Sequence, residues 1–280
     1  MIEYVFLFAL AFVWTVFAAV QDFKTTEVSN WLNFSLIAFV LAYRGFFSIF
    51  SGDWMFLVYG LIGVLAFVGL AYAFYYGRVF AGGDAKLLMG YGGVLPFEKL
   101  GDFGFYGLGF IFLLFFAGAL YTLVYSMVLV GKNKKKFVLS FKKIFMKYKK
   151  IWYFSIGAVE LMIIIMSFLF DFSYYLLLSL FTLVLLPLLY FYVKAVEQSC
   201  MVCLVPPNNL IEGDWLEQDV KVGKKWIRKS IHGLSLEEIN ILRKAKNKVL
   251  IKKGVPFAIS FLMALVLFFY LWFKGLGVLI

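Results

Sequence analysis

Seven stretches of the chain are long, continuous and apolar, and they constrain its fold more than any other feature. The hydrocarbon core of a bilayer is about 30 Å thick, so one helical crossing takes roughly 20 apolar residues. Each stretch approaches that length, and charged residues separate one from the next. They are residues 2–20, 31–50, 54–76, 103–130, 151–170, 174–193 and 255–273. With 64% hydrophobic residues over 280 positions, the sequence predicts an all-α polytopic membrane protein and excludes a soluble domain.

A shorter apolar stretch, residues 85–95, decides the topology. It has too few residues to span an ordinary bilayer, yet counting it as a short crossing puts 24 of the 27 Lys and Arg residues on one side. Because Lys and Arg concentrate on the cytoplasmic side, the N-terminus is assigned to the outside. The basic segments are 21–30, 77–86, 131–150 and 194–254. We therefore expect about eight helices, with one short central helix that carries Asp84.

These boundaries divide the chain into five parts. Residues 1–130 form a membrane core that carries the candidate site, 131–150 a Lys-rich cytoplasmic loop, and 151–193 an additional membrane hairpin. Residues 194–254 form a small cytoplasmic domain, and 255–280 contain the last membrane helix. The formal net charge of +11 follows from this topology, so we expect contact with anionic lipids of the bilayer and no nucleic-acid partner.

Ser235 and Glu238 have the spacing of a capping box ahead of an apolar run. They predict a helix inside the small cytoplasmic domain.

Two aspartates lie at the ends of apolar stretches, where an ionisable residue is costly and so indicates function. Asp22 ends the first stretch and Asp84 begins the short one, so both carboxylates are expected at the same cytoplasmic depth. Two adjacent carboxyl groups hold one proton between them. The ionised member takes a proton from an attacking water, and the other donates one to the carbonyl oxygen of a peptide bond. The alternative is that each aspartate merely caps a helix or marks an interface.

Helix dipoles predict which aspartate carries the charge. Asp22 follows the negative end of its helix, whereas free N–H groups surround Asp84 at the start of the short helix. This predicts Asp84 as the base and Asp22 as the acid.

Sequence motifs around the two aspartates resemble those of one enzyme family. Residues 22–31, Asp-Phe-Lys-Thr-Thr-Glu-Val-Ser-Asn-Trp, are similar to the first-aspartate motif of the type IV prepilin peptidases. Residues 82–87, Gly-Gly-Asp-Ala-Lys-Leu, are similar to their Gly-x-Gly-Asp motif. The resemblance is to the archaeal prepilin and preflagellin peptidases, covers residues 1–130 and extends loosely to 252–257; it is nearer to the longer prepilin peptidases than to the preflagellin ones.

The resemblance implies a membrane aspartyl endopeptidase that uses no cofactor and no metal. Such an enzyme removes the short basic leader from type IV pilin-like or archaeal flagellin precursors at the cytoplasmic membrane face. The resemblance implies Asp22 and Asp84 as the catalytic residues. The residues it implies for substrate binding or the active-site loop are Gly82, Gly83, Lys86 and Asn30. The sequence departs from the motifs at Ala81, which replaces the first glycine, and at Ser29, which replaces a proline.

Other polar residues have simpler interpretations. Cys200 and Cys203 have metal-ligand spacing, but a tetrahedral zinc site takes four ligands, and the sequence has no other Cys and one His. Arg44 is expected to extend toward the outer surface, while Glu160 lies nearer mid-membrane; they either form a pair, or Glu160 is protonated. A transporter or scaffold that binds an ion or a partner through the two aspartates is the second functional class.

Overall fold

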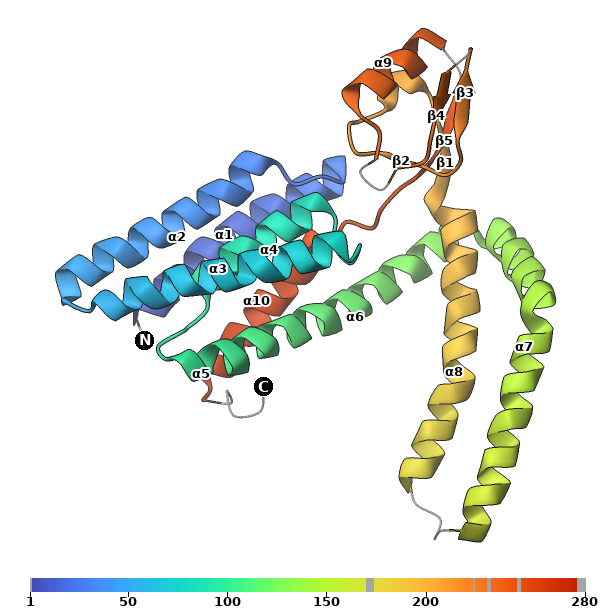
Figure 1. Cartoon of the computed structure of the whole chain (residues 1–280), viewed down its shortest axis with the longest axis horizontal. Coiled ribbons are helices and arrows are strands. Elements are labelled where there is room, and N and C mark those ends of the chain that lie inside the picture. Colours follow the sequence, from blue (N-terminus) through green and yellow to red (C-terminus); the bar gives the residue numbers. More distant parts are fainter. Residues whose placement is uncertain (1, 170–173, 224, 231–232, 246–247, 276–280) are drawn as a thin grey trace. The chain divides into compact units, whose positions relative to one another are not determined.

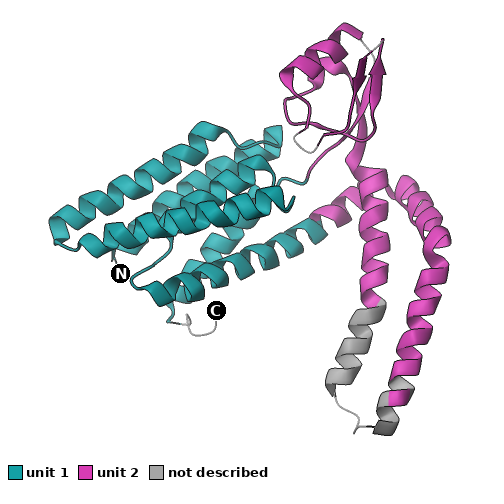
Figure 2. Ribbon diagram, in the orientation of Figure 1, with its two compact units in different colours: residues 1–124, 255–280 teal, residues 125–254 magenta. Residues whose placement is uncertain are grey.

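The computed structural model describes residues 2–169, 174–223, 225–230, 233–245 and 248–275. The chain forms two compact units, shown in Figure 2. Unit 1 comprises residues 1–124 and 255–280, and unit 2 comprises residues 125–254. The last predicted membrane helix thus joins the N-terminal helices in one unit, although more than 100 residues of sequence separate them.

Unit 1 is a bundle of helices (Figure 1). Its elements are α1 (Ile2–Thr25), α2 (Asn30–Ser51), α3 (Trp54–Tyr76), α4 (Gly82–Val94), α5 (Leu100–Asp102), the π-helical turn η1 (Phe103–Gly107), α6 (Leu108–Lys132), which runs on into unit 2, and α10 (Ala258–Phe273). Within the described residues, α1, α2, α3 and the continuous helical stretch Leu100–Lys132 are long and apolar enough to cross a membrane. The prediction of a multi-pass helical membrane protein with a short central helix is confirmed.

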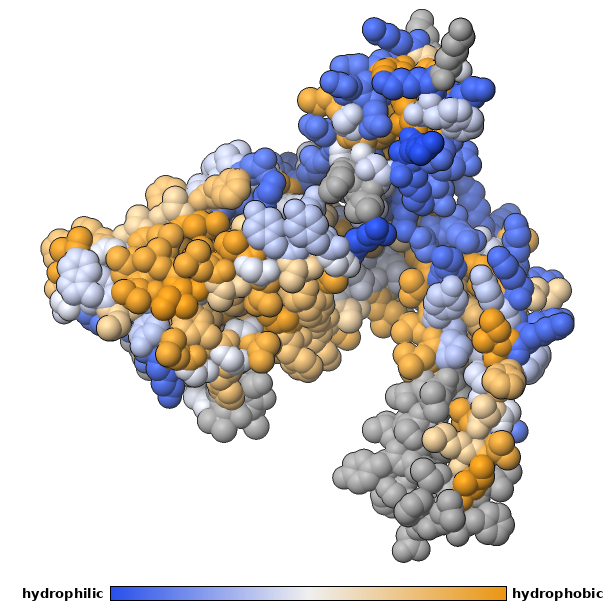
Figure 3. All heavy atoms as spheres, in the orientation of Figure 1, coloured by the Kyte–Doolittle hydropathy of each residue, from blue (hydrophilic) through white to orange (hydrophobic). Residues whose placement is uncertain are grey.

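Local sequence sets where these helices begin and end. Gly52 ends α2 with a positive φ of 74°, which glycine adopts without strain. Asp53 then caps α3 by accepting the N–H of Met55 at 3.0 Å. The bundle is held by a core of aromatic and aliphatic side chains that includes Tyr91, Phe110 and Phe261. Apolar side chains also cover much of the outer surface of unit 1, as Figure 3 shows, which suits a surface that faces lipid.

The short helix α4 packs closely against its neighbours through glycines. A Cβ built on Gly92 would lie 2.1 Å from the backbone oxygen of Gly63 on α3, and one on Gly90 would lie 2.8 Å from the side chain of Leu36 on α2. Such close approach of helix backbones is typical of membrane helices with small residues at their interfaces. The glycines therefore place α4 inside the bundle, where most of its residues are buried.

Unit 2 contains a helical hairpin that is longer than the sequence indicates. It consists of α7 (Lys134–Leu169) and α8 (Tyr174–Val196), and α8 is followed by the π-helical turn η2 (Glu197–Met201). Only Asn133 separates α6 from α7, so the predicted Lys-rich loop 131–150 is almost entirely helical. The physical reason is an aromatic stripe that includes Phe141, Phe145 and Tyr148, which packs near Phe191 of α8.

The small domain in unit 2 contains strands, which the sequence had not indicated. Its strands are β1 (Val202–Val205), β2 (Trp215–Leu216), β3 (Val220–Val222), β4 (Lys225–Ile227) and β5 (Val249–Lys252). β5 pairs antiparallel with β1 and with β2, and β3 pairs antiparallel with β4. The predicted capping box is confirmed at α9 (Leu236–Ala245): Ser235 donates its backbone N–H to Glu238 at 3.0 Å, and Glu238 N–H donates to Ser235 Oγ at 3.3 Å.

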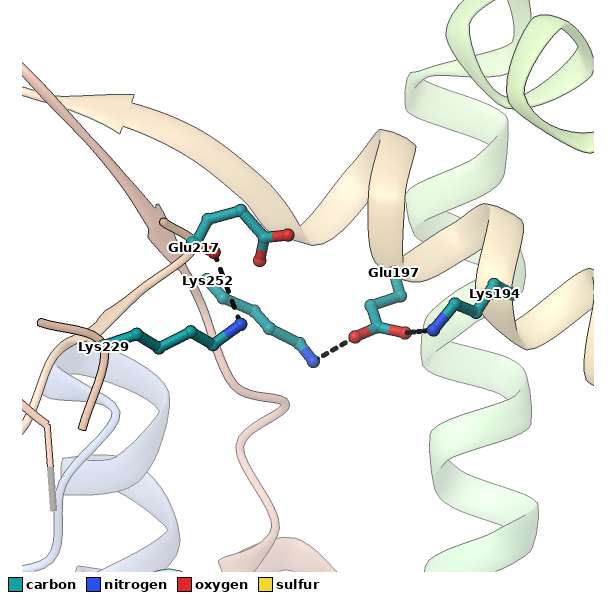
Figure 4. A network of polar contacts seen from close by, with 5 residues as sticks. All are labelled: Lys194, Glu197, Glu217, Lys229 and Lys252. Atoms are coloured by element: carbon teal, nitrogen blue, oxygen red, sulfur yellow. Dashed lines mark hydrogen bonds and ion pairs between the residues drawn. The ribbon is translucent and has the colours of Figure 1, made fainter. Parts of the chain in front are cut away.

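A polar network joins the base of this domain to the end of the hairpin (Figure 4). Glu197, directly after α8, forms ion pairs with Lys252 of β5 and with Lys194 in the last turn of α8. Lys229 donates from Nζ to the backbone oxygen of Glu217 at 3.3 Å. The network therefore fixes the start of β1 against the strand that it pairs with.

Candidate active site

Asp22 is a buried carboxylate in the last turn of α1. Its side chain is only 6% exposed, although it is ionisable and lies in a helix of a membrane bundle. Its Oδ2 accepts the backbone N–H of Ala258, the first residue of α10, at 2.9 Å. The first N–H groups of a helix have no partner within it and carry partial positive charge. Asp22 therefore ends one helix and caps another that follows 236 residues later.

Asp84 lies in the first turn of α4 and is half-buried. Gly83, the residue before Asp84, packs against the backbone of Val28 in the turn that follows α1, and α1 contacts α4. The structure thus brings together the two aspartates that the sequence places 62 positions apart. Two carboxyl groups that approach each other can share one proton, and such a pair can supply both an acid and a base.

The turn before Asp84 is held by an asparagine that sequence reasoning missed. Asn33 of α2 is fully buried and donates from Nδ2 to the backbone oxygen of Gly83 at 3.2 Å. A Cβ on Gly83 would lie 3.2 Å from the backbone nitrogen of Val28, which is tighter than ordinary contact. At Gly82 the nearest atom would be a Tyr75 ring carbon at 3.7 Å, which is ordinary contact. Of the two predicted glycines, Gly83 therefore makes the close approach.

Two further predicted residues bind each other. Lys86 donates from Nζ to Asn30 Oδ1 at 2.7 Å, which joins the start of α2 to the first turns of α4. Ser29, in place of the family's proline, donates its backbone N–H and its hydroxyl to Gln21 Oε1 at 2.9 and 3.0 Å. Gln21 precedes Asp22, so this contact holds the turn that leaves the first aspartate.

Gln21 and Asn33 were not predicted as site residues. Only one signal was available: Asn33 lies one helical turn after Asn30, on the same face of α2.

Arg44 differs from its prediction. It is fully buried instead of extending to the surface, and it donates to backbone carbonyl oxygens of Phe56, Gly93 and Leu95. Those carbonyls satisfy the guanidinium, so it has no need to reach water. Glu160 belongs to unit 2, on α7, and its side chain is exposed.

The cysteine pair has no metal-site surroundings among the residues that the structure describes. Cys200 and Cys203 are free thiols there, and no group of three or more His, Cys, Asp or Glu side chains is arranged to hold a metal ion.

Comparison with known proteins agrees with the motifs. Residues 9–126, which include both aspartates, match the type IV leader peptidase family. A 79-residue segment is 30% identical to the preflagellin peptidase of Methanocaldococcus jannaschii and covers 28% of this chain and 33% of that protein. The chain thus aligns with about a third of the length of this curated relative. No solved structure matches the chain.

Proposed function

Because residues 9–126 belong to the type IV leader peptidase family, we propose that this chain is a membrane aspartyl endopeptidase that cleaves type IV pilin-like or archaeal flagellin precursors. The proposal is carried by one observation: Asp22, in the last turn of α1, and Asp84, in the first turn of α4, lie at neighbouring helix ends, because Gly83 packs against Val28 in the turn that follows α1. The relative whose name supports the substrate class is a preflagellin peptidase.

The proposed chemistry uses the two carboxyl groups and one water. Asp22 is held in place by the Ala258 N–H at the positive end of α10, and such a bond favours the charged carboxylate. We therefore assign Asp22 as the base that takes a proton from water, and Asp84 as the acid that donates one to the scissile carbonyl oxygen. This reverses the assignment from the dipole of α1, because α10 presents its positive end to the same carboxylate.

The surrounding residues have proposed roles in holding the turn and the substrate. Asn33 fixes the carbonyl of Gly83 and so orients Asp84, while Gly83, which has no side chain, lets the start of α4 pack closely on Val28. The Lys86–Asn30 contact closes the rim of the site.

The site is proposed to open at the cytoplasmic membrane face. The assignment rests on the Lys and Arg distribution, which places the end of α1 and the start of α4 on the basic side. There the apolar helix of a precursor stays in lipid while its basic leader remains in water.

The test is cleavage by the whole purified chain in detergent. Precursors of type IV pilins and of archaeal flagellins are incubated with it, and the products are identified by mass spectrometry. We expect loss of the leader at one peptide bond just before the hydrophobic segment. No cleavage of any precursor, together with ion-dependent stabilisation that disappears in Asp22→Ala, would instead support a transporter or scaffold that binds an ion at the aspartates.

A further inference from the structure

The short helix α4 ends where water does not reach. Its 13 residues span about 20 Å, whereas the hydrocarbon core is about 30 Å thick. The segment that leaves it is buried as well, since Val94, Leu95 and Phe97 are inaccessible to solvent. The last carbonyl groups of a helix have no partner within it, and a carbonyl left unpaired in the hydrocarbon region destabilises the fold.

Arg44 donates to two carbonyl oxygens at this end of α4, and that of Leu95 also accepts the backbone N–H of Phe97 at 2.9 Å. Arg44 Nε donates to the oxygen of Gly93 at 2.7 Å and its Nη2 to the oxygen of Leu95 at 2.8 Å. The third bond, from Nη1 to the oxygen of Phe56 at 2.7 Å, reaches the first turns of α3. One planar guanidinium on α2 thus joins the end of α4 to α3, an arrangement that the single point charge of a lysine does not reproduce.

The bundle is shaped around this side chain. A Cβ on Gly60 would lie 2.2 Å from Arg44 Cδ, so glycine at that position leaves the space that the arginine occupies. The guanidinium carbon also lies 4.4 Å from the ring centroid of Phe56 and 5.6 Å from that of Tyr4. Carbonyl dipoles and ring faces therefore provide the negative partial charge around a buried cation.

Asp102 binds backbone N–H groups of the segment that follows α4. Its Oδ2 accepts the N–H groups of Glu98 at 2.9 Å and of Lys99 at 3.1 Å, and the side chain is buried. Arg44 therefore pairs with backbone acceptors and Asp102 with backbone donors of one irregular segment.

We propose that Arg44 is a positioning residue: it fixes the inner end of α4 and thereby sets where Asp84, at the other end, lies relative to Asp22. Gly93 follows Asp84 by nine residues, about 14 Å along one helix, so a shift at the arginine moves the carboxyl group. The catalytic part of this inference rests on the proposed peptidase activity. The capping part does not.

The kinetic test compares Arg44→Lys and Arg44→Gln with wild type, and uses Lys99→Gln as the control. Lys99 is an exposed cation in the same segment, so its removal changes charge without touching the α4 end. We expect both Arg44 variants to lower kcat about 10- to 100-fold while KM stays within about twofold, because the pair is misplaced and the precursor still binds. The pH profile of kcat should also shift, whereas Lys99→Gln should match wild type.

A folding defect is separated from misplacement by two measurements. Fold is followed by thermal unfolding of the whole chain in detergent, and capping by hydrogen exchange of the amides of residues 90–97. If Arg44→Lys has the kcat and pH profile of wild type, or if activity falls only in proportion to the folded fraction, positioning is wrong. If the amides of residues 90–97 exchange no faster in either variant than in wild type, the inference that Arg44 caps the end of α4 is wrong. If wild type cleaves no precursor, the proposed function is wrong. The hydrogen-exchange result still tests whether Arg44 caps α4.

Discussion

Asp22 accepts the backbone N–H of Ala258 at 2.9 Å, so the carboxylate at the end of the first helix also caps the last one. The bond closes the bundle of unit 1, because it connects the two ends of the sequence that form that unit. A residue proposed for catalysis therefore has a structural task as well, and substitutions at Asp22 must be chosen so that the two tasks are distinguished.

Asp22→Ala should destabilise the protein as well as inactivate it. Loss of a capping acceptor costs about 0.5–2 kcal/mol, whereas Asp22→Asn keeps an acceptor oxygen for Ala258. Thermal unfolding in detergent should therefore show a lower midpoint for the alanine variant and a nearly unchanged one for the asparagine variant. Equal midpoints for Asp22→Ala and wild type would mean that the Ala258 contact contributes nothing to stability.

Gly83→Ala and Gly82→Ala form a matched pair beside Asp84. The added methyl group at Gly83 meets the backbone of Val28, which shifts the turn by a few tenths of an ångström, while the one at Gly82 fits. We expect kcat to fall about tenfold in Gly83→Ala and to stay near wild type in Gly82→Ala. A similar effect of both substitutions would show that close backbone approach is not what Gly83 provides.

The charge of the leader should affect cleavage through the acidic groups of the site. Reversing Lys or Arg to Glu just before the cut should lower kcat/KM roughly threefold for each residue, and high salt should reduce the difference. The measurement is a peptide series at two ionic strengths. Equal rates for a Glu-containing leader and the natural one would exclude electrostatic selection.

The Glu197–Lys252 ion pair predicts a pH dependence in unit 2. Burial alone would raise the pKa of Glu197, but the hydrogen bond and charge of Lys252, with that of Lys194, outweigh burial and lower this pKa. A lowered folded pKa gives a stabilisation that is complete above the ordinary value of about 4.5 and is lost as the pH falls through the folded value.

Hydrogen exchange at β1 and β5 in the whole chain, corrected for intrinsic rates, measures this effect. Protection in wild type should fall toward that of Glu197→Gln as the pH drops from 6 to 3. Glu217→Gln is the control, because Glu217 binds Lys229 through its backbone oxygen. The same pH dependence in wild type and Glu197→Gln would contradict a role for the pair.

The sequence predicts the helices of unit 1 and the candidate pair because both depend on local signals. Apolar length marks a crossing, and a carboxylate at the end of such a run is costly enough to indicate function. The contact of Asp22 with Ala258 is not predictable in this way. The donor is a backbone N–H 236 residues away, and every residue except proline carries such a group.

Arg44 and the first half of α7 show the same limit in other forms. A charged residue in an apolar run, such as Arg44, is expected to extend its side chain to water. Only the folded position of the end of α4 shows that the backbone carbonyls of Gly93 and Leu95 bind the guanidinium instead. The lysines of residues 134–150 suggest a solvated loop, but their aromatic neighbours recur with helical spacing and pack on α8.

Cleavage of a precursor by Asp22→Asn and Asp84→Asn, each reconstituted in liposomes beside wild type, tests the central claim most directly. Both substitutions keep the size of the side chain and remove its ability to exchange a proton. We predict that each variant folds like wild type and releases no leader, a loss of at least about 1,000-fold in rate. Cleavage at or near the wild-type rate by either folded variant would contradict an aspartate pair as the catalytic centre.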